Sequence, residues 1–172
     1  MKNICLLLLA VSICITVPSL ANLPFNSHTA AWPDYSDTVG VSGYVNSLYS
    51  INIKAVRGFK QIYKNIEQET WYVIPGGFRA KFVDKGILYA VTYNEKGKWL
   101  STVRQYSEKE LPKDVRGAVK SIYYDYTITL VEEIEQPWQP IVYLVHMEDA
   151  LTLKNIQFCD RQMETVLDIK KL

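Results

Sequence analysis

The chain has 172 residues, of which 48% are hydrophobic and 22% charged, and its formal net charge is +1. This length is enough for one domain of ordinary size with a hydrophobic core. A charge balance so close to zero gives no long-range attraction to nucleic acid or anionic lipid, so we expect neither as a partner.

The N-terminus has the layout of a secretory signal peptide. Lys2 precedes an apolar run over residues 4–17, and the small residues Ser19 and Ala21 lie just before a cut after Ala21. The run is shorter than the roughly 20 residues that a membrane-spanning helix needs. We therefore expect residues 1–21 to be removed, no membrane span, and a periplasmic or secreted protein.

Removal of this segment changes the charge and the cysteine content. Of the 19 Lys and Arg residues only Lys2 would be lost, while all 18 acidic residues would stay, so the formal charges would balance. Cys5 and Cys14 would also leave. Cys159 would then be the only cysteine, and it could form neither an internal disulfide nor a cysteine zinc site.

Residues 22–50 differ in composition from the rest of the chain. They are rich in Ser, Pro, Gly, Asn and Asp and have no sustained hydrophobic period. This composition predicts an N-terminal arm or linker, which the aromatic side chains of Trp32 and Tyr35 would order by packing.

A helical pattern then occurs twice. The stretch "VRGFKQIY" at residues 56–63 nearly recurs as "VRGAVKSIY" at residues 115–123, and both place apolar residues at steps of three and four. Gly58 and Gly117 fall at the margin of each stripe, where we expect the helix edge to approach a strand closely. The predicted core stripes are Val56, Phe59, Ile62, Tyr63 and Ile66 in the first helix and Val115, Ala118, Val119, Ile122 and Tyr126 in the second.

An alternating strand pattern follows each helix. Residues 70–74 predict a short strand, and residues 78–103 predict a three-stranded meander joined by turns at "VDKG" and "NEKG". One copy alone would leave a sheet edge and half an apolar face uncovered. The expected fold class is α+β: two tandem helix-plus-antiparallel-meander repeats, residues 51–106 and 107–172, forming one continuous antiparallel sheet with both helices on one face.

The motifs of this region resemble a known family. "GGFRAKFVDKGILYAVTYNEKGKWLSTVRQY", followed by "LPKDVRGAVKSIYYDYTI", is similar to the PepSY-like, beta-lactamase-inhibitor-like family of small exported bacterial proteins, and the resemblance runs from about Ile53 to the C-terminus. It implies an envelope location in Gram-negative bacteria and the tandem helix-and-sheet fold of the beta-lactamase inhibitor proteins. It transfers no catalytic residue, and likeness of fold does not determine function.

Groups for catalysis are sparse. His28 lies in the arm, and alternation places His146 on the solvent side of a strand. The acidic run of Glu132, Glu133 and Glu135 predicts a solvated strand end or loop rather than an acid–base pair. No zinc, GxSxG or phosphate-loop pattern occurs in the sequence. We expect no enzyme activity, no catalytic residue, no cofactor and no metal site, and an unrecognised hydrolase is the weakest alternative.

The sheet face away from the helices remains as the predicted functional surface. It carries aliphatic side chains, which leaves three interpretations open: cover by the arm, packing against a second molecule, or binding of an envelope protein or peptide. Trp138, in "QPWQP", is a further candidate because prolines stiffen its loop and tryptophan is common among interface anchors, although it could instead cap the core. The candidate protein-binding residues are Tyr72, Arg79, Lys81, Leu88, Trp138, Leu144 and His146.

These observations lead to one main hypothesis. We expect a noncatalytic exported binding module, inhibitor-like or peptidase-regulating, that is a monomer or a weak homo-oligomer. The alternative is a structural envelope protein that self-associates through its sheet.

Overall fold

The structure is a computed structural model of the chain, and it describes residues 50–172. The expected signal peptide, its cut after Ala21, and the arm up to residue 49 lie outside the described residues. Within residues 50–172, no helix has the length and apolar character needed to cross a membrane.

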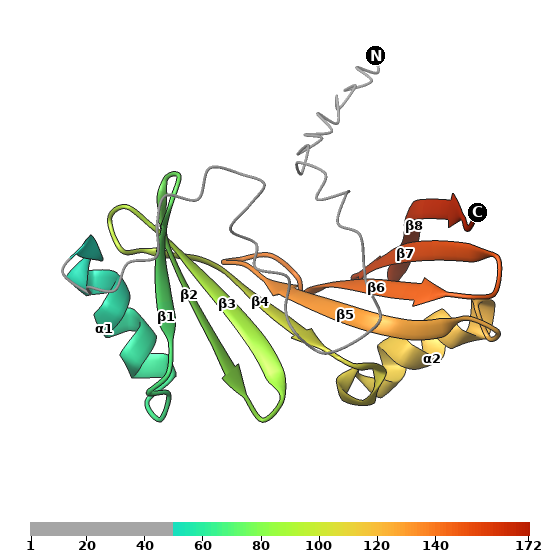
Figure 1. The fold of residues 1–172 in the computed structure, drawn as a ribbon, viewed down its shortest axis with the longest axis horizontal. Coiled ribbons are helices and arrows are strands. Elements are labelled where there is room, and N and C mark those ends of the chain that lie inside the picture. The colour runs from blue at the N-terminus through green and yellow to red at the C-terminus, as the bar shows by residue number, and fades with distance from the viewer. Residues whose placement is uncertain (1–49) are drawn as a thin grey trace, which may run out of the picture. The chain divides into compact units, whose positions relative to one another are not determined.

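Eight strands form one open antiparallel sheet in chain order, accompanied by two α-helices (Figure 1). The elements are α1 Ile53–Ile62, β1 Thr70–Ile74, β2 Gly77–Asp84, β3 Ile87–Asn94, β4 Trp99–Tyr106, the short 3-10 helix η2 Glu108–Glu110, α2 Lys113–Ile122, β5 Thr127–Glu135, β6 Val142–Glu148, β7 Thr152–Cys159 and β8 Gln162–Lys170. The α+β class and the continuous antiparallel sheet are confirmed. That the two halves are repeats of one another stays a prediction.

Helix α1 begins with a side-chain N-cap. The Asn52 side chain accepts a hydrogen bond from the Lys54 backbone N–H at 2.9 Å, as an N-cap does, and its Nδ2 donates to the Glu95 carbonyl at 2.9 Å. Gly97 lies in the same β3–β4 turn with φ +75°, and a Cβ there would lie 2.7 Å from the Ala55 nitrogen. The start of α1 is therefore fixed to the end of β3.

The pairing register places both helices on the same side of the sheet. Residues directly opposite in adjacent strands share a face. One such row crosses strands β2 to β7 through Phe82, Tyr89, Arg104, Glu133, Tyr143 and Phe158. Phe82 belongs to the core under α1 and Phe158 to the core under α2, so both cores lie on one face. The opposite side is called the open face below.

The core under α1 is aromatic. Phe59 of α1 makes edge-to-face contacts with Trp71 of β1 at 5.5 Å and with Phe82 of β2 at 5.4 Å between ring centroids. Such contacts add about 0.5–1.5 kcal/mol per pair beyond the burial of apolar area. They hold α1 against the first strands of the sheet.

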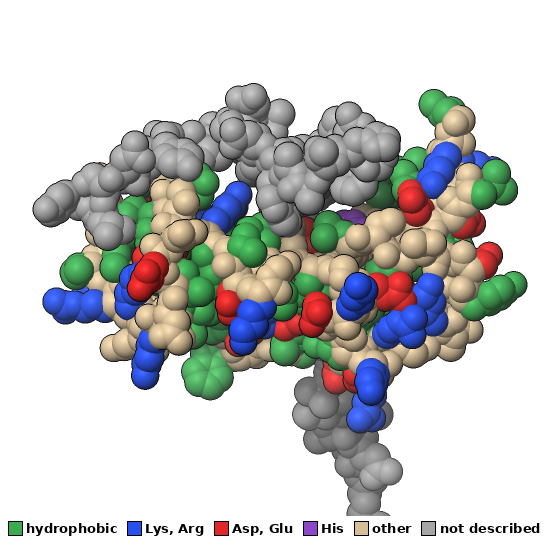
Figure 2. All heavy atoms as spheres, turned by 60° about the horizontal axis from the view of Figure 1, so that its bottom comes forward, with side chains coloured by type: hydrophobic (Ala, Val, Ile, Leu, Met, Phe, Trp, Pro, Cys, Tyr) green, Lys and Arg blue, Asp and Glu red, His purple; other side chains and the backbone are tan. Residues whose placement is uncertain are grey.

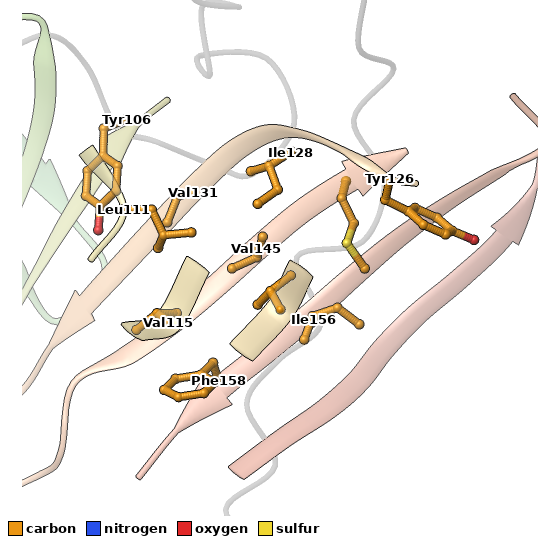
Figure 3. Packing of buried hydrophobic residues seen from close by; sticks show 11 residues of the cluster. Tyr106, Leu111, Val115, Tyr126, Ile128, Val131, Val145, Ile156 and Phe158 are labelled. Carbon is orange, nitrogen blue, oxygen red and sulfur yellow. The ribbon is translucent and has the colours of Figure 1, made fainter. Parts of the chain in front are cut away.

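The core under α2 is mainly aliphatic. Val115 and Val119 of α2 are buried against strand residues that include Val131, Val145 and Ile156. Figure 3 shows this cluster, with Tyr106 and Tyr126 at its two ends. The apolar stripe of α2 therefore packs on β5, β6 and β7.

Two details of the helix predictions are wrong. Ile62 and Ile122 are 66% and 60% exposed, because each is the last residue of its helix and lies beyond the buried stripe. A Cβ on Gly58 would make only an ordinary 3.8 Å contact with the Tyr93 ring, and one on Gly117 would meet no atom of the described chain within 4 Å. These glycines do not serve a close approach to a strand.

Candidate functional site

The open face holds six of the residues predicted to bind a partner. The strand register places all six on the side of the sheet away from the two helices. Their paired positions are Tyr72 opposite Arg79, Lys81 opposite Ala90, Leu88 opposite Gln105, Leu144 opposite Glu132 and His146 opposite Asn155. The alternation of the sequence thus predicted their face correctly. Binding by these residues stays a prediction.

An aliphatic row crosses the middle of the open face. Ala90 of β3, Val103 of β4, Ile134 of β5 and Val142 of β6 occupy directly paired positions in four adjacent strands. Adjacent strands lie about 4.8 Å apart, so these side chains form a continuous apolar strip. The strip joins the two halves of the sheet on the face that the described helices leave uncovered.

A basic and aromatic corner lies at the β1 end of this strip. The Lys81 ammonium is 5.4 Å from the centre of the Tyr72 ring, within the range of a cation–π contact. The Arg79 Nε donates to the Thr92 hydroxyl at 3.3 Å. These contacts orient two cationic side chains beside the strip.

A polar group lies on the open face near its centre. The Gln105 amide donates to Glu132 Oε1 at 2.5 Å, and His146 Nε2 lies 3.7 Å from Glu132 Oε2, close enough for electrostatic attraction but not for a hydrogen bond. Burial acts to raise the pKa of Glu132, but His146 and Gln105 lower it more, so this pKa lies below its ordinary value. The open face therefore has a basic corner at β1 and β2 and a carboxylate at its centre.

The opposite side of the same strands carries a second polar cluster, which the sequence did not reveal. Arg104 of β4 donates from Nη1 to Glu133 at 2.5 Å and from Nη2 to Glu135 at 2.7 Å, and the Tyr106 hydroxyl donates to the other oxygen of Glu133 at 2.6 Å. Burial and the Glu133 carboxylate raise the pKa of Tyr106, so its phenol stays protonated. We call this cluster of Arg104, Tyr106, Glu133 and Glu135 the β4–β5 seam.

The pairing of β4 with β5 corrects one part of the interpretation of the acidic run. Glu132, Glu133 and Glu135 lie at the C-terminal end of β5, so the expected strand end is confirmed, but they are only partly exposed and each has a partner on β4. The pairing of Arg104 with Glu133 arises from the β4–β5 register, which no single-strand pattern encodes. Each of these carboxylates therefore makes a side-chain contact across the β4–β5 pairing.

Trp138 lies in the connection between β5 and β6, residues 136–141. Its side chain is 97% exposed, so it does not cap the core. Its backbone φ is +61°, in the left-handed region that residues with a Cβ seldom adopt. The indole therefore projects from the end of a hairpin.

Other chemistry is sparse in the part of the chain that the structure describes. Residues 50–172 contain no group of three His, Cys, Asp or Glu side chains that could hold a metal ion. Cys159 is a free, half-buried thiol at the end of β7. On the side that Figure 2 presents, basic and acidic side chains are interspersed, so this side has no extended area of one sign.

Comparison with known proteins gives matches of fold only. No family model matches the chain, and no curated protein matches it. Among solved structures, a DUF2874 family protein from Bacteroides uniformis is similar with a TM-score of 0.57 at 17% identity, over 69% of this chain and 88% of that one. A candidate periplasmic protein from Bacteroides eggerthii gives a TM-score of 0.58 at 15% identity, over 70% of this chain and 88% of that one.

A BLIP-like protein, that is, one like the beta-lactamase inhibitor protein, from Bacteroides fragilis is also similar. Its TM-score is 0.58 at 18% identity, over 70% of this chain and 86% of that one. This neighbour supports the beta-lactamase-inhibitor-like part of the family resemblance, whereas the PepSY part stays a prediction. At these identities, the chain shares the fold of DUF2874 and BLIP-like proteins.

Proposed function

We propose that this chain is a noncatalytic binding module of the bacterial envelope that contacts a protein or peptide partner through the open face. In this proposal residues 1–21 are a cleaved signal peptide, and residues 51–106 and 107–172 are two PepSY-like repeats. The candidate contact residues are those of the basic corner, the aliphatic strip and the polar group around Glu132.

The aliphatic strip is the observation that carries the proposal. Four aliphatic residues, from Ala90 to Val142, occupy paired positions on a face that the described helices do not cover. Apolar surface flanked by charged groups is typical of protein interfaces, in which the apolar part supplies affinity and the charges supply orientation.

The structural neighbours point in the same direction. One of them is BLIP-like and another is a candidate periplasmic protein, which fits an exported protein of the inhibitor type. The seam residues are paired with one another, which favours binding over hydrolysis. Inhibition of a beta-lactamase or regulation of a peptidase are the forms of this function that we consider first.

The test uses the purified chain and variants of the open face. Leu144→Glu and Lys81→Glu alter the surface, while Lys113→Glu, at the exposed start of α2, is the matched control. The inhibitor form is assayed as loss of cephalosporin hydrolysis by a purified serine beta-lactamase, and other partners are sought by affinity capture from an envelope extract. Each captured protein is then purified, and its affinity for wild type and for each variant is measured by calorimetry.

We expect both open-face variants to bind at least about tenfold more weakly than wild type, with the control unchanged. If the chain binds no envelope protein, or if both variants bind as wild type does, this face is not the binding surface. Self-association through the sheet is the alternative, and light scattering over a concentration series decides it, since a strictly monomeric chain removes that option.

A further inference from the structure

The tryptophan at the end of the β5–β6 hairpin occupies a position that suits glycine. The Gln139 N–H reaches the Gln136 carbonyl at 3.4 Å, which closes a four-residue turn with Pro137 second and Trp138 third. With φ +61° at its third residue, this turn resembles type II, in which glycine is preferred at that place. Turn geometry therefore does not explain the tryptophan.

Packing does not explain Trp138 either. The indole is 97% exposed, so its contacts within the described chain bury almost none of its surface. Large aromatic side chains stabilise a fold through the area that they bury. An exposed tryptophan in a disfavoured backbone conformation gains nothing from the fold, and this points to a contact outside the chain.

The hairpin holds the indole in place before any partner arrives. Pro137 fixes its own φ, and Pro140 limits the other arm of the loop. At the base, Glu135 is bound to Arg104 at 2.7 Å, and Ile134 pairs with Val142. A side chain presented on so constrained a loop loses little conformational freedom on binding.

We propose that Trp138 is an anchor that inserts into an apolar pocket of the protein partner, an inference that rests on the proposed binding function. Ile141, which is 39% exposed in the same connection, adds apolar area beside it. The pocket would carry a hydrogen-bond acceptor for the indole N–H and, near Glu135, a neutral or basic rim.

The charge of the connection favours a protein over a membrane as the occupant. Residues 136–141 contain neither Lys nor Arg, and three glutamates precede them in β5. Segments that lie on bacterial membranes combine apolar residues with cationic ones, because the lipid surface is anionic. The acidic approach to Trp138 would be repelled from such a surface.

The test begins with photo-crosslinking in the producing cells. The full chain carries p-benzoylphenylalanine in place of Trp138, and a control carries it in place of the exposed Thr129 of β5. A protein crosslinked from position 138 and not from 129 is purified. Its affinity is then measured by calorimetry for wild type, Trp138→Gly, Trp138→Phe and Leu144→Glu, and wild type and Trp138→Phe are also mixed with vesicles of phosphatidylethanolamine and phosphatidylglycerol.

We expect Trp138→Gly to raise the melting temperature of the free chain and to weaken binding by about 30-fold or more. The affinity of Trp138→Phe should lie between those of wild type and Trp138→Gly. The anchor is refuted if position 138 crosslinks no protein, if Trp138→Gly binds within twofold of wild type, or if the vesicles shift the tryptophan emission of wild type but not that of Trp138→Phe. If Leu144→Glu loses affinity while Trp138→Gly keeps it, only the anchor fails. If wild type itself binds nothing, the proposed function fails.

Discussion

Removal of the Tyr93 hydroxyl is expected to stabilise the fold. Tyr93 is 2% exposed and lies in the core under α1, with its ring 5.8 Å from that of Trp71. Its hydroxyl has no hydrogen-bond partner within residues 50–172. Burial raises the pKa of this phenol, so the group stays neutral. Tyr93→Phe keeps the ring and removes only the unpartnered polar atom.

The size of the effect follows from the cost of the unpartnered group. A buried hydroxyl without a partner costs about 1–3 kcal/mol, and loss of the oxygen leaves a small void that offsets part of the gain. We therefore expect the free energy of unfolding to rise by about 1 kcal/mol. For a domain of this size, the melting temperature would rise by about 4 °C.

Tyr106→Phe is the matched control, because the same atom is removed from an equally buried ring. Tyr106 is 6% exposed, but its hydroxyl donates to the Glu133 carboxylate at 2.6 Å. Loss of a hydrogen bond to a charged group should lower the free energy of unfolding by about 1.5–3 kcal/mol. The two substitutions should therefore change the free energy of unfolding in opposite directions.

Urea unfolding followed by circular dichroism measures the free energy of unfolding of both variants. The slope of this free energy against urea concentration should be the same as in wild type, which shows that the unfolded state is unchanged. If Tyr93→Phe destabilises the protein as much as Tyr106→Phe does, the Tyr93 hydroxyl has a partner in solution.

Three further changes test two glycines and the polar group of the open face. Gly117→Ala should raise the free energy of unfolding by about 1 kcal/mol, because a Cβ there meets no described atom within 4 Å. Gly97→Ala should lower the free energy of unfolding, because Gly97 has φ +75° and a Cβ there would lie 2.7 Å from the Ala55 nitrogen. The midpoints of urea unfolding measure both effects. The pKa of Glu132 is lowered by folding, so its contribution to stability is present above the unfolded pKa and is lost as the pH falls through the folded pKa. Between pH 6 and pH 3 the urea midpoint of wild type should therefore fall more than that of Glu132→Gln, and equal falls would contradict this assignment.

The sequence predicted the faces of the sheet better than the pairs within it. Alternation was enough to place Lys81 and Leu144 on the open face, because side chains in a strand point to opposite sides with a period of two. It could not show that Arg104 meets Glu133, because that contact depends on which strands are neighbours and in what register. The φ of Trp138 was hidden for a similar reason, since "QPWQP" fits several turns.

Polar contacts between β4 and β5 link the two halves of the molecule on both sides of the sheet. On the helix side Arg104 pairs with Glu133, and on the open side Gln105 pairs with Glu132, so neighbouring residues of the same two strands make polar contacts on opposite faces. Partly buried ion pairs add little net stability, because desolvation offsets their attraction.

They do specify register. A slip of one residue between β4 and β5 would turn Glu133 toward the open face and leave Arg104 without its carboxylate. The same slip would break the aliphatic strip between Val103 and Ile134, where the strip passes from β4 to β5. The Arg104–Glu133 pair is therefore better understood as a contact that keeps the proposed binding surface continuous across the two halves than as a site of chemistry. A partner that spans the strip would then depend on two residues of the opposite face that it never touches.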